Sequence, residues 1–89
     1  MYTLKYDVDW DGYFQDVPDE IKKRFLKRRE KFKNFPTTSF RHSRQGLPYF
    51  VDEIGQYRIC FISEEEKKMR MFYFIGKHKE YEKFLGIRK

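Results

Sequence analysis

The sequence predicts a small α+β domain over residues 1–89, with an N-terminal strand and helices packed on a twisted antiparallel sheet and a short C-terminal helix. Its 89 residues match the size of one domain. Ten Phe, seven Tyr and one Trp supply enough apolar surface for a core, although 38% of the residues are charged. One helix-like segment precedes three consecutive strand-like segments, an order typical of α+β folds.

The first half of the chain reads as a strand followed by helices. Residues 2–8 alternate loosely between apolar and polar side chains, as a half-buried strand does. Tyr13 and Phe14 then suit a short helical turn. Pro18 in a first helical position, followed by two acidic residues that favour a helix N-terminus, starts a helix that should end near Asn34.

This long helix is amphipathic. Ile21, Phe25, Phe32 and Phe35 recur at helical spacing and form one apolar face, whereas most of the lysines fall elsewhere. Arg28 lies inside the apolar stripe, and we expect its guanidinium to extend to the rim of the core. The helix should therefore pack on a sheet.

The second half of the chain predicts an antiparallel meander. Gly55-Gln56 suits a type II′ hairpin turn with glycine first, and the charged run at 64–68 suits a solvated connection. Residues 80–85 are helical in pattern and end before a glycine. The expected strands span residues 49–54, 57–63 and 69–75, after a short, basic, strand-like segment at 40–45.

The charge balance narrows the class of partner. Twenty Lys and Arg against 14 Asp and Glu give a net charge of +6 and a pI near 9.5, which attracts a polyanion or an acidic protein. The single cysteine, Cys60, lies in an apolar stretch, has no partner for an internal disulfide and reads as a small buried hydrophobe. No apolar segment approaches the roughly twenty residues of a membrane span. We expect a cytoplasmic protein that does not bind a membrane.

Several kinds of chemistry are disfavoured by the sequence. One cysteine and two widely separated histidines do not form a recognisable zinc arrangement. The chain has no glycine-rich phosphate loop and no dinucleotide-binding fingerprint. We therefore expect neither a metal ion nor an organic cofactor.

Basic side chains gather around the predicted meander. Because the last two strands are antiparallel, the start of one should lie beside the end of the other, which makes Arg58 and His78 neighbours. Arg41, Arg44 and Lys79 are then candidates for binding nucleic acid. The basic residues and histidines concerned are Arg41, His42 and Arg44 before the meander, Arg58 beside its first turn, and Lys77, His78 and Lys79 after its last strand.

Such a cluster suits RNA cleavage by attack of a 2′-hydroxyl on the adjacent phosphate. His78 is the candidate general acid or base, because histidine is the residue type that ordinarily exchanges a proton near neutral pH. Arg58 can hold phosphate oxygens through two parallel donors, and Lys77 adds positive charge. Tyr81 would stack on a base or position a hydroxyl.

Simpler interpretations stand beside these. Arg58 would pair with Asp52 or Glu53 across the hairpin, and Tyr81 would pack under its own helix. The residues alone support a protein that binds a nucleic acid or an acidic partner, without establishing cleavage.

The order of elements and two short motifs resemble the RelE/ParE superfamily of bacterial and archaeal type II toxins. The first motif is Gly55-Gln56-Tyr57-Arg58-Ile59, with its strand arginine. The second runs from Phe72 to Tyr81, where an apolar strand ends in glycine and is followed by basic, histidine and tyrosine residues. The resemblance covers nearly the whole chain, but only these two motifs are specific.

The resemblance implies a toxin that cleaves mRNA, often in the ribosomal A site, and that is silenced by a cognate acidic antitoxin wrapped around it. It implies that Arg58 contacts the scissile phosphate and that Lys77 and His78 occupy the basic or acid/base positions. It also implies that Tyr81 or Phe84 occupies the aromatic position beyond them.

The chain also departs from the family pattern. The strand that carries catalytic lysines in ribosome-dependent members reads Tyr49-Phe50-Val51-Asp52-Glu53 here and has no lysine. Asp52 or Glu53 could instead act as a base beside His78 as acid. The alternatives are a non-cleaving toxin like the gyrase-poisoning ParE branch, a degenerate relative that only binds an antitoxin, and a basic RNA-binding module.

Overall fold

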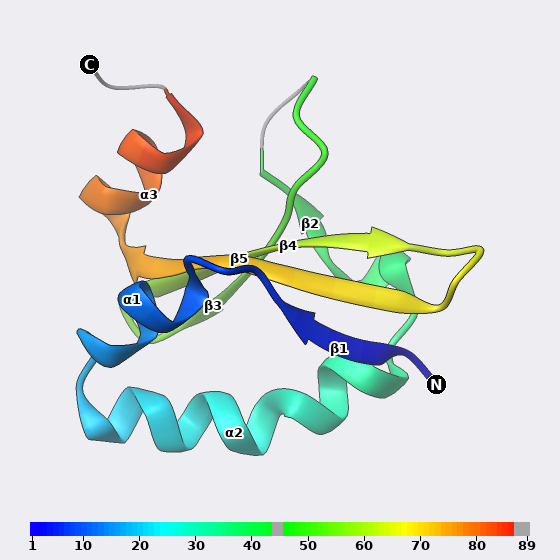
Figure 1. The fold of residues 1–89 in the computed structure, drawn as a ribbon, viewed down its shortest axis with the longest axis horizontal. Coiled ribbons are helices and arrows are strands. Elements are labelled where there is room, and N and C mark those ends of the chain that lie inside the picture. The colour runs from blue at the N-terminus through cyan, green and yellow to red at the C-terminus, as the bar shows by residue number, and fades with distance from the viewer. Residues whose placement is uncertain (44–45, 87–89) are drawn as a thin grey trace.

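The computed structural model of the protein describes residues 1–43 and 46–86. A five-stranded sheet in the order β1-β5-β4-β3-β2 forms the centre, with α2 along one face and α3 on the other near one end (Figure 1). The strands are β1 (Thr3–Tyr6), β2 (Arg41–His42), β3 (Phe50–Ile54), β4 (Tyr57–Glu64) and β5 (Met69–Lys77). The helices are α1 (Trp10–Gln15), α2 (Asp19–Asn34), the 3-10 turn η1 (Thr37–Ser39) and α3 (His78–Leu85).

The predicted α+β fold is confirmed, and the long helix and the three-strand meander lie where the sequence placed them. Pro18 is the N-cap of α2, one position before the helix, rather than its first residue. Gly55 has a φ of +59° in the β3–β4 turn, a conformation that favours glycine and fits the type II′ turn. At the end of the chain, β5 extends to Lys77 and α3 begins at His78, two residues before the predicted start of the helix.

The sheet is mixed rather than wholly antiparallel. β1 pairs in parallel with the first half of β5, from Thr3 opposite Met69 to Tyr6 opposite Phe72. The remaining pairs along the sheet are antiparallel. Since parallel neighbours need a long crossover, β1 can reach this edge only because α2 and the meander intervene in the chain. The second half of β5 therefore has no strand on its outer side among the described residues.

A β-bulge in β5 explains why its apolar run is continuous. Cys60 pairs with Phe74 but the next residue of β4 pairs with Phe72, so Tyr73 is left over. The extra residue reverses the alternation of side chains. As a result Phe72 packs on the face under α2, and Phe74 packs on the face under α3.

Aromatic rings fill the face under α2. Phe25 and Phe32 of α2 meet Phe61 and Phe72 of the sheet, and the Phe32 and Phe72 rings contact edge to face with centroids 4.9 Å apart. Phe32, Phe61 and Phe72 are fully buried. This edge-to-face packing fixes the position of α2 on the sheet.

A smaller cluster fills the opposite face under α3. It contains Cys60, whose thiol has its pKa raised to about 12 by burial, so the cysteine is an unreactive core residue as predicted. Gly76 belongs to the same region. A side-chain carbon there would lie 2.6 Å from the ring of Phe74, so only glycine fits this close packing.

A buried arginine is the least expected feature of the core. Arg70 has no exposed surface and lies on the α2 face of β5. Its Nη1 donates to the carbonyl of Phe32 at 2.7 Å, its Nη2 to Oγ1 of Thr37 at 3.0 Å and its Nε to Oγ of Ser63 at 3.0 Å. The guanidinium also lies 3.6 Å from the centroid of the Tyr2 ring. Arg70 therefore joins the residue before β1, the end of α2, η1 and the β4–β5 hairpin.

Glu65 completes this polar group at the surface. Its carboxylate accepts hydrogen bonds from Ser63, Thr37 and Tyr2, and these bonds lower its pKa to about 2. A depressed folded-state pKa gives stability that is present above the ordinary pKa and is lost as the pH falls toward the folded value.

We therefore expect the free energy of unfolding to decline between about pH 4.5 and pH 2, in part through Glu65. In Glu65→Gln this part of the decline should be absent, and the variant should be less stable than the parent at pH 6. Urea unfolding at pH 6 and pH 3 measures both effects. Equal pH dependence in the two proteins would contradict the assignment.

Candidate functional site

The register of β4 and β5 builds the candidate site. Tyr57 pairs with Lys77 and Arg58 pairs with Gly76, so the start of β4 lies beside the end of β5. A surface cavity of 420 Å³ opens at this point. The cavity is lined by Glu53, Gln56, Arg58, Lys77, His78 and Lys79. The predicted approach of Arg58 to His78 is thus present in the structure.

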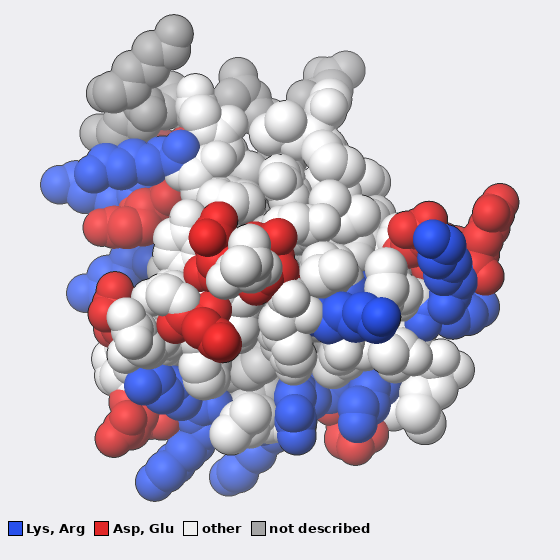
Figure 2. Space-filling model, viewed as in Figure 1, with Lys and Arg blue, Asp and Glu red and all other residues white. Residues whose placement is uncertain are grey.

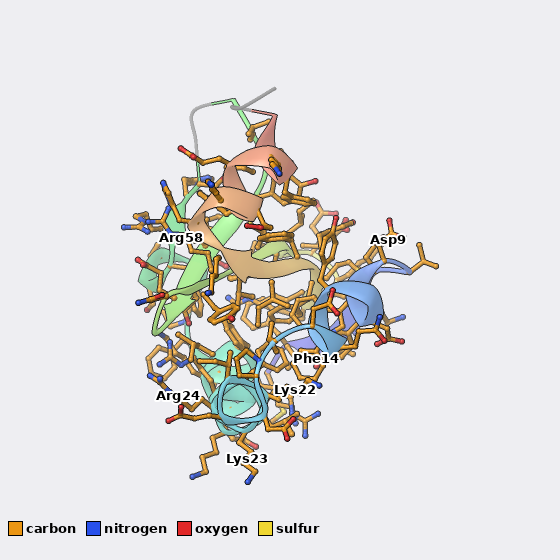
Figure 3. All side chains as sticks on the ribbon, turned by 90° about the vertical axis from the view of Figure 1, so that its left-hand side faces the viewer. Asp9, Phe14, Lys22, Lys23, Arg24 and Arg58 are labelled. Atoms are coloured by element: carbon orange, nitrogen blue, oxygen red, sulfur yellow. The ribbon has the colours of Figure 1, made fainter. Side chains whose placement is uncertain are left out.

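Arg58 is held on two sides. Its guanidinium lies 4.9 Å from the centroid of the Tyr81 ring, and its Nε lies 3.8 Å from Oε2 of Glu53. Its side chain keeps 25% of its surface exposed. Figure 3 shows Arg58 next to the ribbon that leads from β5 into α3. A guanidinium that is fixed in this way and lines the cavity is suited to bind an anion.

Tyr81 is a core residue rather than a surface platform. Only 5% of its surface is exposed, and it packs with Val51, Cys60 and Phe74. Burial raises the pKa of its hydroxyl, while the charge of Arg58 acts in the opposite direction. Because the ring is covered, it offers no face for stacking on a base. Its place in the site is to support Arg58 from below.

The two acidic residues of β3 have different surroundings. Neighbouring residues of a strand point to opposite faces, and here Asp52 points toward α2. Its carboxylate lies 3.3 Å from both Nη1 of Arg28 and Nζ of Lys31, with 14% of the side chain exposed. Arg28, expected to extend to the rim, thus finds its partner there and also donates to the carbonyl of Glu53.

Glu53 lies on the cavity side. Its carboxylate is 3.1 Å from Nη2 of Arg41 and 3.8 Å from Nε of Arg58, and 45% of the side chain is exposed. The sequence offered Asp52 and Glu53 as alternative candidates for the base. Glu53 is the one that lies beside Arg58 and lines the same cavity as His78. Arg41, a predicted RNA-binding residue, is joined to the site through Glu53.

His78 begins α3 and stands at the rim of the cavity. Its side chain is 59% exposed, and Nε2 lies 3.4 Å from Oε2 of Glu82, one turn further along the helix. Lys77 and Lys79 on either side of it are exposed and line the same cavity. The imidazole lies at the edge of the aromatic core, with its ring centroid 6.2 Å from that of Tyr81, and its exposed surface is open to a ligand. Arg44, the remaining predicted RNA-binding residue, lies outside the described residues.

Positive charge extends beyond the cavity. Figure 2 shows Lys and Arg side chains gathered along α2, at the bottom of that view. Within residues 1–43 and 46–86, no helix is both long and apolar enough to cross a bilayer. The same residues contain no group of three or more metal-ligating side chains placed to hold an ion.

The architecture defines a class: the chain has the RelE-like toxin fold. The E. coli RelE toxin bound to an antitoxin RelBc peptide is 16% identical, covers 99% of this chain and 95% of its own, and superposes with a TM-score of 0.76. A chain of the RelBE2 toxin-antitoxin complex of Mycobacterium tuberculosis is 14% identical. The match covers 86% of this chain and 98% of that chain, with a TM-score of 0.75.

An archaeal RelE-RelB complex from Pyrococcus horikoshii is 18% identical, covers 85% of this chain and 93% of its own, and gives a TM-score of 0.67. No protein-family model and no curated protein sequence matches the chain. At these identities the similarity establishes the fold alone.

Proposed function

We propose that the protein is the toxin of a type II toxin-antitoxin system and an endoribonuclease that cleaves mRNA and thereby inhibits translation. The observation that carries the proposal is the shared cavity of Arg58, Glu53 and His78 on a RelE-like toxin fold. One fixed cation, one carboxylate and one exposed imidazole are the groups that phosphodiester transfer requires.

The reaction needs no cofactor. Glu53 takes the proton of the 2′-hydroxyl as that oxygen attacks phosphorus. The bond from phosphorus to the 5′-oxygen breaks, and His78 gives a proton to the leaving oxygen. The products are a 2′,3′-cyclic phosphate and a 5′-hydroxyl end. Arg58 stabilises the charge on the crowded phosphate, with Lys77 as further electrostatic support.

The different surroundings of Glu53 and Asp52 make the base assignment testable. Glu53→Gln should lower the rate of RNA cleavage by roughly 10²- to 10⁴-fold, the usual contribution of a general base. Asp52→Asn is the matched control, with the same loss of charge on the same strand, and should cleave at nearly the parent rate. Cleavage of a fluorescent oligoribonucleotide measures both. An Asp52→Asn variant as defective as Glu53→Gln would contradict the assignment.

The proposed partners follow from charge. The net charge of +6 and the cationic surface of α2 suit both RNA and an acidic antitoxin. Such a protein would work in the cytoplasm, where mRNA and ribosomes are found. Arg41 and Lys79 would hold RNA phosphates that flank the cleaved bond, and Arg44 is proposed for the same role from the sequence.

The direct test of the function is induction of the protein in bacteria with and without the neighbouring short reading frame. The proposal predicts growth arrest, rescue by the neighbouring frame and new cleaved ends in mRNA. Arrest without cleavage would instead indicate a toxin that acts by binding a protein.

A further inference from the structure

A second cavity lies against the first, at the outer edge of β5. It has a volume of 240 Å³, and its walls come from α1, the α1–α2 connection, the start of β4, the end of β5 and α3. Figure 3 looks toward this region, with α1, marked by Phe14, on one side of the end of β5 and Arg58 on the other. Lys77 lines both cavities, so the two adjoin at this side chain.

The end of the sheet leaves this cavity open. β1 pairs with β5 only as far as Phe72, so Ile75, Gly76 and Lys77 have β4 on one side and the cavity on the other. Gly76 is itself buried, because the Phe74 ring occupies the place where a side chain at Gly76 would lie, and both residues line the cavity. At about 30 Å³ for each water, the space equals roughly eight water molecules, which suits one nucleobase but not a base pair.

The lining side chains fall into two kinds. Tyr13 and Tyr57 contribute half-buried aromatic rings, and the Tyr13 ring is fixed edge to face on Phe74 with centroids 4.8 Å apart. Asp16 and Glu80 contribute exposed carboxylates. Aromatic walls suit the faces of a base, and carboxylates accept hydrogen bonds from its N–H groups.

We propose that this cavity binds a guanine base of the RNA next to the cleaved phosphate and so sets the cleavage preference. This inference rests on the proposed function, because the phosphate of that nucleotide would lie at Arg58 and Lys77. Guanine presents two neighbouring donors, the N1–H and the 2-amino group, which match a carboxylate acceptor. Uracil offers a single N–H, and adenine and cytosine each offer one amino group.

The test measures binding without cleavage. Fluorescent 2′-O-methyl pentaribonucleotides cannot react, because the attacking hydroxyl is blocked, and they differ only in the central base: guanine, inosine, adenine, cytosine or uracil. We expect guanine to bind about tenfold more tightly than inosine, which lacks the 2-amino group and hence one charge-assisted hydrogen bond.

Variants test whether the cavity causes the preference for guanine over inosine. The double variant Asp16→Asn with Glu80→Gln should lose the preference for guanine over inosine while its affinity for the other oligonucleotides stays similar. Asp11→Asn, an exposed α1 carboxylate outside the cavity, is the matched control and should keep the preference. Arg58→Ala should weaken all five oligonucleotides equally.

The outcomes separate this inference from the proposed function. Equal affinities for guanine and inosine in the parent protein, or a preference that survives in the double variant, would overturn the guanine site even if RNA is cleaved. A guanine preference that is lost in the double variant supports the site. If natural RNA is then not cleaved, only the nuclease proposal fails.

Discussion

Arg58→Ala is expected to abolish growth arrest and to lower RNA cleavage by on the order of 10²- to 10³-fold, the usual loss when one donor to a reacting oxyanion is removed. The guanidinium is held by the Tyr81 ring and the Glu53 carboxylate, so alanine removes a fixed cation from the cavity. Colony counts after induction and cleavage of an oligoribonucleotide measure the effect.

Two controls make the Arg58 result specific. Arg58→Lys keeps the charge but loses the parallel donors, so it should restore only part of the activity. Lys67→Ala removes an exposed cation of the β4–β5 turn that lies outside both cavities and should remain fully toxic. Because the Arg58 side chain is partly exposed, the thermal unfolding of the Arg58→Ala variant should differ little from that of the parent protein. Full toxicity of a well-expressed Arg58→Ala variant would refute the site.

Arg70→Met is expected to destabilise the fold by about 3 kcal/mol. The substitution leaves the carbonyl of Phe32 buried without its donor and removes the bonds to Thr37 and Ser63. It also removes the cation that lies against the Tyr2 ring. Urea denaturation, read by intrinsic fluorescence, measures the change.

A second substitution separates geometry from charge at Arg70. Arg70→Lys retains a positive charge but cannot reach three acceptors at once, so it should be nearly as unstable as the methionine variant. Met69→Leu changes the neighbouring half-buried residue and is the control. It should alter the free energy of unfolding by much less than Arg70→Met does. An Arg70→Met variant as stable as the parent would show that the buried network contributes no net stability.

Much of the fold is readable from local patterns. The apolar spacing of α2, the glycine-first turn at Gly55 and the antiparallel order of the meander all follow from short-range chemistry, and the structure has them. That order also brings Arg58 near His78, since a hairpin places the ends of its strands together. The part of the site that depends on one hairpin was therefore predictable.

The features of the fold and the site that could not be predicted from the sequence depend on long-range contacts. The parallel pairing of β1 with β5 joins residues far apart in the chain. Alternation in β3 says that Asp52 and Glu53 face opposite sides, but only the position of α2 decides which one reaches the cavity. The bulge at Tyr73 likewise breaks the simple alternation that sequence reasoning assumes.

Arg70 is visible in the sequence as an unusual residue, but its role depends on distant parts of the chain. It is one cation within a run of apolar residues, two positions before Phe72 and on the same face. A charged residue at a core position of a strand requires buried acceptors. Those acceptors come from α2, η1 and β4, and no local pattern identifies them.

The central claim is that Arg58, Glu53 and His78 form a nuclease site, and mapping of mRNA 5′ ends after induction tests it most directly. Discrete new 5′-hydroxyl ends are expected in cells that express the parent protein. They should be absent in cells that express Arg58→Ala or Glu53→Gln at equal protein levels. Growth arrest by the parent protein without new RNA ends would contradict the account.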